Sequence, residues 1–118
     1  MRDRRATDYL PMSEAMFHVL VALADGDKHG YSIMKDVAER TNGGVQLSTG
    51  TLYGIVKRLL ADGFVVEVRK RATQDDSARK RRAYTLTTFG REVAKAEAAR
   101  LNRLVTVARA ASLITKTS

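Results

Sequence analysis

The sequence contains no cysteine, so neither a disulfide framework nor a thiolate metal site is available to it. Its two histidines, His18 and His29, form no ligand set with other residues at metal-binding spacing, so we expect no metal ion and no other cofactor. No apolar run is long enough to span a membrane, and the N-terminus has no signal-peptide core. We therefore expect a cytoplasmic protein without a membrane partner, with 118 residues forming one domain around a modest core.

The sequence also lacks the usual marks of an enzyme. It has no glycine-rich loop that could hold a phosphate, no cluster of carboxylates, and no nucleophile beside a base. The hydroxyls of Ser48, Thr49 and Thr51 are better explained by helix capping and by hydrogen bonds to phosphate. We expect no catalytic activity. No aromatic stacking surface accompanies the basic residues, which disfavours RNA as a partner.

What the sequence does have is positive charge, gathered in one segment. The net charge is +8, and residues 69–82 alone hold seven basic and two acidic residues. Residues 9–68 are slightly acidic, with seven acidic and five basic side chains. Clustered basic charge indicates a polyanionic partner such as DNA, although a solvated charged loop remains the alternative.

The segment from Ser48 to Asp62 has the pattern of a DNA-recognition helix. Five apolar residues recur at helical spacing and predict a buried stripe. The opposite face is small at its start, then aromatic, then cationic, which suits insertion into the major groove. An ordinary amphipathic helix with a solvated face is the alternative. The predicted buried stripe is Leu52, Ile55, Val56, Leu59 and Leu60, and the opposite face is Gly50, Tyr53, Gly54 and Lys57, flanked by Thr51 and Arg58.

The order of predicted elements indicates a winged helix-turn-helix fold. One helix follows the cap Ser13, and a second opens at Lys28 and ends in a glycine turn near residue 43. The third helix is capped by Ser48 or Thr49, and Thr87 caps the last one. Two β-branched or alternating segments, 64–69 and 82–86, then predict a hairpin around the basic residues. We expect a mainly α protein with a small β-hairpin (α+β). The predicted parts are a flexible arm over residues 1–10, the winged helix domain over 11–86, and a C-terminal dimerisation helix and tail over 87–118.

A long last helix is predicted from Thr87 to about Ser112. Small and apolar residues recur along it with 4-3-4-3 spacing, the pattern of a helix–helix seam. A domain this small cannot cover the whole length of this helix, so we expect two copies of the chain to pair through it. The alternative is a helix that folds back over its own domain. The predicted dimerisation residues are Ala94, Ala98, Leu101, Leu104, Val105 and Ala108.

Four motifs in order make the chain resemble the PadR-like transcriptional regulators over roughly residues 11–112. The resemblance implies a dimeric winged helix repressor, often controlled by a small molecule, and the short C-terminus resembles the compact subfamily with a single C-terminal helix. The matching motifs are His29-Gly30-Tyr31, Gly50-Thr51-Leu52-Tyr53, Arg58-Leu59-Leu60-Ala61-Asp62-Gly63 and Tyr84-Thr85-Leu86-Thr87-Thr88-Phe89-Gly90-Arg91.

These observations give one functional hypothesis and one rival. We expect a homodimer that binds an inverted-repeat operator in double-stranded DNA; a winged helix that binds only other proteins is the rival. A small apolar or aromatic effector is expected where the last helices meet the first ones, lined by Met12, Met16, Leu101 and Val105, because methionine makes such a surface adaptable. The predicted DNA-binding residues are Lys28, His29, Tyr31, Ser48, Thr49, Thr51, Tyr53, Gly54, Lys57, Arg58, Lys70, Arg79, Lys80 and Arg81.

Overall fold

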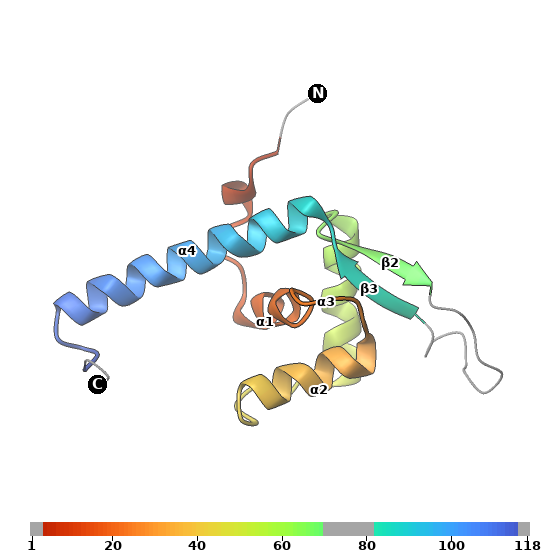
Figure 1. Cartoon of the computed structure of the whole chain (residues 1–118), viewed down its shortest axis with the longest axis horizontal. Coiled ribbons are helices and arrows are strands. Elements are labelled where there is room, and N and C mark those ends of the chain that lie inside the picture. The colour runs from red at the N-terminus through yellow and green to blue at the C-terminus, as the bar shows by residue number, and fades with distance from the viewer. Residues whose placement is uncertain (1–3, 70–81, 116–118) are drawn as a thin grey trace.

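The computed structural model describes residues 4–69 and 82–115, which fold into four α-helices, a short 3-10 helix and a three-stranded sheet (Figure 1). The predicted wing contacts Lys70, Arg79, Lys80 and Arg81 lie outside the described residues. The mainly α fold with a small sheet, expected from the sequence, is confirmed. The elements in chain order are η1 (Ala6–Tyr9), α1 (Glu14–Ala22), β1 (Lys28–His29), α2 (Gly30–Arg40), α3 (Thr49–Ala61), β2 (Val65–Arg69), β3 (Arg82–Leu86) and α4 (Thr88–Ala110).

Three helices begin at the hydroxyl caps that the sequence predicts. The side chains of Ser13, Ser48 and Thr87 each accept a hydrogen bond from the backbone N–H three residues later, at 3.1, 3.1 and 2.9 Å. Each bond satisfies a donor that the first helical turn leaves free. The starts of α1, α3 and α4 are therefore set by local chemistry.

The sheet has the order β1-β3-β2, and all its pairings are antiparallel. The predicted hairpin is confirmed, with Val65 opposite Leu86 and Arg69 opposite Arg82. The sequence analysis began the second helix at Lys28, whereas Lys28 and His29 form the edge strand β1 against β3. Two residues are too short a strand to produce a periodic signal, and only the folded position of β3 gives them a partner.

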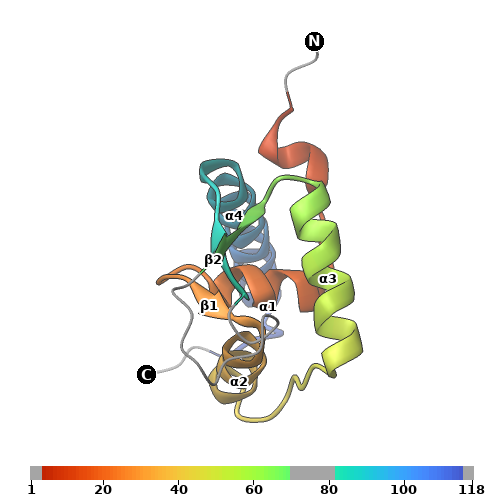
Figure 2. The same ribbon diagram turned by 90° about the vertical axis from the view of Figure 1, so that its right-hand side faces the viewer.

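The core lies between α1, α2, α3 and the sheet (Figure 2). On α3 the predicted stripe is confirmed for Leu52, Val56 and Leu59, which are buried, while Ile55 is half-buried. Leu60 was predicted to be buried and is 37% exposed, because it lies at the edge of the stripe near the end of α3. Tyr84 of β3 is buried, and so is the preceding residue, Ala83.

Residues 4–10 of the predicted flexible arm lie against the domain in the structure. Here η1 packs against α4, and the ring of Tyr9 meets those of Phe64 and Phe89 with centroids 5.0 and 5.8 Å apart. The guanidinium of Arg4 lies 4.3 Å from the centre of the Phe89 ring. These aromatic contacts are between residues far apart in sequence, so no local pattern announces them.

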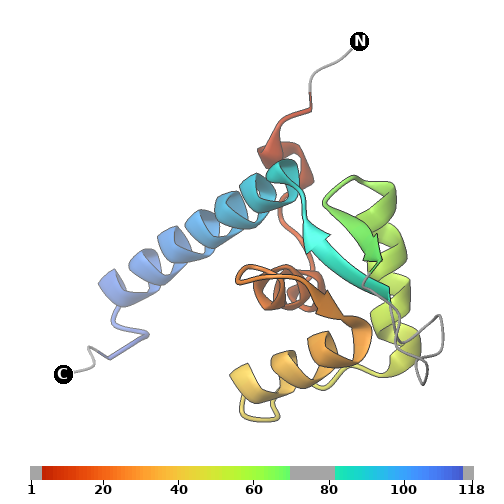
Figure 3. The same ribbon diagram turned by 45° about the vertical axis from the view of Figure 1, so that its right-hand side comes forward.

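Helix α4 is covered at its beginning and bare at its end. Gly90, Val93 and Glu97 are buried against the rest of the domain. A Cβ on Gly90 would lie 1.9 Å from the carbonyl oxygen of Phe64, so only glycine allows this close approach. Figures 1 and 3 both show the C-terminal half of α4 extending away from α1, α2 and α3. Within the described residues, no helix is long and apolar enough to cross a membrane.

Candidate nucleic-acid interface

The outward face of α3 presents small residues and then cations. Gly50 and Gly54 are exposed, and a Cβ built on either would meet no atom within 4 Å. Lys57 and Arg58 follow them on the same helix, and both are exposed. A large molecule can therefore approach the backbone of α3 closely at two glycines, with positive charge one turn further along.

The first turn of α3 adds hydroxyl groups to this face. Ser48 accepts the N–H of Thr51, and the two hydroxyls are 3.0 Å apart. Ser48, Thr49 and Thr51 are all exposed. The capping bond holds two of the hydroxyls in fixed positions, from which they can also bond to an anionic partner.

The far end of α3 is held by an arginine that the sequence analysis did not single out. Nη1 of Arg4 donates to the carbonyl oxygen of Asp62 at 2.6 Å and to the hydroxyl of Tyr9 at 3.2 Å. The carboxylate of Asp62 accepts Nε of Arg58 at 3.3 Å. The N-terminal segment thus fixes the C-terminal end of α3, and a contact spanning 58 positions leaves no signal in the sequence pattern.

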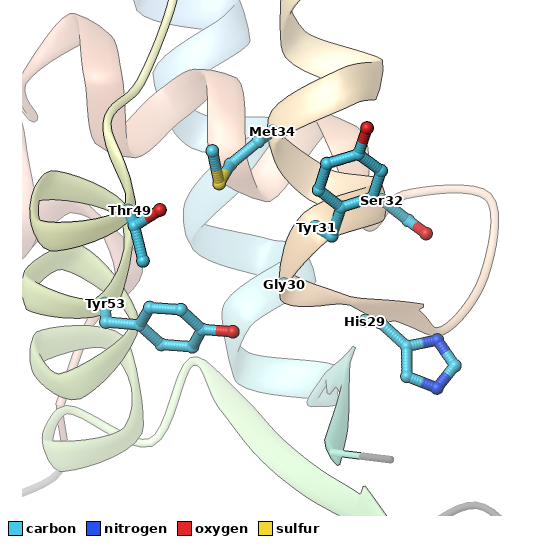
Figure 4. Close-up of a pocket in the computed structure, with 7 residues that line it drawn as sticks. All are labelled: His29, Gly30, Tyr31, Ser32, Met34, Thr49 and Tyr53. Atoms are coloured by element: carbon cyan, nitrogen blue, oxygen red, sulfur yellow. The ribbon is translucent and has the colours of Figure 1, made fainter. Parts of the chain in front are cut away.

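Tyr53 was placed on the outward face of α3 by its spacing, but its ring is turned inward. It is half-buried and packs against the core. Figure 4 shows it reaching from α3 toward Gly30 at the start of α2. A Cβ on Gly30 would lie 2.3 Å from the Tyr53 hydroxyl oxygen, so the absence of a side chain at position 30 makes room for the ring. Tyr53 joins α2 to α3. A partner can contact only the exposed part of its ring.

Lys28, one of the predicted DNA-binding residues, makes its polar contacts within the domain. Its ammonium donates to the carbonyl oxygen of Ala22, at the end of α1, and to the carboxylate of Asp25. The hydrogen bond and the charge of Lys28 hold the pKa of Asp25 below its ordinary value. Lys28 therefore closes the turn after α1, where it stabilises the last carbonyl of that helix.

A cavity of about 530 Å³ lies where the first turns of α2 and α3 meet (Figure 4). Among the residues around it, Tyr31 is 73% exposed and His29 is half-buried. The structure thus brings four predicted DNA-binding residues, His29, Tyr31, Thr49 and Tyr53, to one place. The sequence analysis did not anticipate a cavity there. Its lining residues are His29, Gly30, Tyr31, Ser32, Met34, Thr49 and Tyr53.

The predicted dimerisation residues of α4 divide into two groups. Ala94, Leu101 and Ala108 are half-buried, and Ala94 packs against the core of its own domain. Ala98 is exposed, as are Leu104, at 52%, and Val105. Val107, which the predicted seam omits, is 65% exposed. The first turns of α4 thus fold over their own domain, which was the alternative interpretation, while apolar side chains stay uncovered further along.

Glu97 joins α4 to the segment before α1. Its side chain is 2% exposed, and its two carboxylate oxygens accept Nε and Nη2 of Arg100 at 2.7 and 2.8 Å. These bonds, together with one from the backbone N–H of Met12, lower the pKa of Glu97 and outweigh the effect of burial. The sequence does contain a signal for this position, since Gly90, Val93 and Glu97 follow helical spacing, but a carboxylate was not expected on a buried face.

Of the predicted effector residues, Met12 and Met16 are half-buried and pack against the core. Leu101 is also half-buried, and Val105 is exposed. None of these four residues lines the cavity between α2 and α3. The cavity is therefore separate from the predicted effector surface.

The family model described as "Transcriptional regulator PadR-like family" matches residues 19–96, which run from α1 through the sheet into α4. This match spans more than half of the chain. The chain belongs to the PadR-like family of transcriptional regulators. The resemblance expected from the sequence is thereby confirmed, and the matched range includes the α3 face and the cavity.

Solved structures with this fold include PadR-family and other regulators. A PadR family transcription regulator from Clostridium difficile has a TM-score of 0.67 at 21% identity, over 82% of this chain and 96% of that one. Bacillus subtilis PadR in complex with operator DNA has a TM-score of 0.61 at 22% identity, over 77% of this chain and 48% of that one. The DNA binding of Bordetella bronchiseptica BpsR is described as regulated by 6-hydroxynicotinic acid. Its structure has a TM-score of 0.62 at 23% identity, over 81% of this chain and 64% of that one.

A curated relative is closer in sequence but much longer. The chain is 37% identical, over 92 residues, to an uncharacterized 37.1 kDa protein in transposon TN4556 of Streptomyces fradiae. The match covers 78% of this chain and 24% of that protein. The chain thus spans about a quarter of the length of this relative.

Proposed function

We propose that this PadR-like regulator is a homodimeric repressor that binds a specific sequence in double-stranded DNA. The observation that carries the proposal is the outward face of α3, where exposed Gly50 and Gly54 precede exposed Lys57 and Arg58. A helix that reads the major groove needs close backbone approach and side chains that reach base edges and phosphates. The operator-bound Bacillus subtilis PadR, which shares this fold, supports the proposal. Such a protein would act in the cytoplasm.

The exposed apolar residues of α4 support the homodimer. Leu104, Val105 and Val107 lie on the part of α4 that extends beyond its own domain. Leu104 and Val107, three residues apart, share one face of this helix, and such an apolar face gains stability when a second helix covers it. Two-fold pairing through α4 would present two α3 helices to one side of a duplex. This arrangement requires an inverted repeat with half-site centres about 34 Å, or roughly 10 base pairs, apart.

Repression and its release follow from the same arrangement. A dimer bound at a promoter blocks access without any further domain. A small apolar or aromatic molecule lodged between the paired α4 helices and Met12 and Met16 would change the angle between the two winged helices. The description of BpsR, whose DNA binding is regulated by 6-hydroxynicotinic acid, supports control of this kind.

Selection from a random pool of duplexes tests the proposal. We expect enrichment of an inverted repeat, and specific binding in fluorescence anisotropy that is weakened in Lys57→Ala by about 1–3 kcal/mol. Lys95→Ala, which removes an exposed lysine from α4 instead of α3, should bind like the wild type. Failure to enrich any sequence, together with weak binding that vanishes at moderate salt, would favour a winged helix that binds other proteins.

A further inference from the structure

The cavity between α2 and α3 has the size and lining of a small-molecule site. Its volume of about 530 Å³ lies within the range of roughly 300–1,000 Å³ that is typical of ligand pockets. Figure 4 shows Met34 and Thr49 close together on one side of the Tyr53 ring, whose hydroxyl points toward Gly30. Met34 is half-buried and packs against the core, so the floor of the cavity is part of the folded domain.

The side chains around the cavity favour a flat aromatic ligand. Two tyrosine rings, an imidazole and a thioether line it, and each of these groups packs well against the face or edge of an aromatic ring. The hydroxyls of Ser32, Thr49 and Tyr53 can hydrogen-bond to a polar substituent. None of the seven lining residues is acidic, so no carboxylate is present to pair with a cationic ligand.

We propose that this cavity binds a planar aromatic molecule, neutral or anionic, and that such a ligand and DNA exclude one another. Four of the lining residues, His29, Tyr31, Thr49 and Tyr53, are also among those expected to contact DNA. A ligand seated among them would compete with the duplex for the same side chains. This differs from the site between paired α4 helices, because each protomer holds the whole cavity. Ligand binding by the free protein is independent of the proposed function, whereas the exclusion of DNA rests on it.

Nuclear magnetic resonance of the full chain can locate the site, because the reporter side chains are few. The sequence has two histidines and four methionines. Titration with 2-naphthoate should shift the methyl signal of Met34 and the ring signals of His29 in a saturable way. The ring signals of His18, which does not line the cavity, should stay in place. Cyclohexanecarboxylate, an anion of the same charge without an aromatic ring, should produce no saturable shift.

A matched pair of variants separates this cavity from the site at the paired helices. Met34→Ala should weaken 2-naphthoate binding about tenfold or more in calorimetry, whereas Met16→Ala should leave it unchanged. No saturable shift at Met34 and His29, or shifts confined to Met12 and Met16, would overturn the ligand site. Equal binding of cyclohexanecarboxylate would overturn the aromatic class.

Competition tests the second part of the proposal. Saturating 2-naphthoate should raise the Kd for the selected duplex about tenfold or more, and the duplex should weaken 2-naphthoate binding by the same factor, as linkage requires. An unchanged duplex Kd with the ligand bound would overturn the exclusion of DNA. If no duplex binds, the proposed function fails, while the shifts at Met34 and His29 still decide the ligand site.

Discussion

The hydroxyl oxygen of Tyr53 lies where a side chain at position 30 would begin, 2.3 Å from an ideal Cβ on Gly30. This contact joins the start of α2 to the second turn of α3, the two helices of the helix-turn-helix. Gly30→Ala must therefore displace the Tyr53 ring. The same substitution would otherwise favour the helix slightly, since alanine has a higher helix propensity than glycine.

A double-mutant cycle measures the coupling between these two residues. Gly30→Ala should lower the free energy of unfolding in the wild type but not in a Tyr53→Ala background, with a coupling energy of about 0.5–3 kcal/mol from urea unfolding. Equal effects in both backgrounds would mean that the ring does not depend on the space at position 30.

Gly54 offers the opposite test, because its Cβ direction is open. Gly54→Ala should raise the stability of α3 by about 0.5–1 kcal/mol, since glycine is unfavourable inside a helix. The same methyl group lies on the face proposed to enter the groove, so specific DNA binding should fall while thermal stability rises. A variant that is both more stable and fully active in anisotropy would show that the α3 backbone does not approach DNA closely at this point.

Structural features that depend on neighbours in the sequence could be predicted, whereas features that depend on distant residues could not. Ser13, Ser48 and Thr87 cap helices through bonds to residues three positions away, so local sequence sufficed to predict them. Tyr53 was misplaced because its position depends on Gly30, a residue of another helix. The bonds of Lys28 to the end of α1 and to Asp25 were not predicted either, because they form only once the turn after α1 is folded.

The role of Arg4 could not be predicted either, and it leads to a test of how α3 is positioned. Arg4→Ala removes the donor to the Asp62 carbonyl and the contact with the Phe89 ring. We expect weaker specific DNA binding with an unchanged dependence of log K on log salt, because the guanidinium is engaged within the protein and releases no counterion from DNA. Arg5→Ala, at the exposed neighbouring position, is the control. A flatter salt dependence in Arg4→Ala would show instead that Arg4 contacts phosphate.

Glu97 gives a pH-dependent contribution to stability. Its pKa is lowered in the folded protein, chiefly by hydrogen bonds from Arg100, so the ionised carboxylate stabilises the fold above the ordinary value of 4.5. This contribution is lost as the pH falls below that value and the carboxylate takes up a proton. Glu97→Gln should therefore lower the melting temperature at pH 7 and have a smaller effect at pH 3. Glu92→Gln, at an exposed position of α4, is the control; an equal loss at both pH values in Glu97→Gln would point to packing instead of charge.

The last prediction concerns the exposed apolar part of α4. Leu104→Asp places a carboxylate where the proposed dimer would bury an apolar side chain, and two-fold symmetry places two such charges in the interface. Because Leu104 is 52% exposed in the single chain, the fold of each protomer should survive, with an unchanged helical circular dichroism spectrum. Sedimentation should show a monomer, and operator binding should be lost, since one α3 helix cannot contact two half-sites.

The control for this variant is Thr106→Asp, which adds the same charge at an exposed polar position on the same helix. It should sediment as a dimer and bind the operator, so that a loss confined to Leu104→Asp traces to the apolar contact and not to added charge. If Leu104→Asp remains a dimer that holds the operator, α4 does not pair through this residue. The exposed apolar side chains of α4 would then have to be covered by another partner, and the two α3 helices would be spaced by a different contact from the one proposed.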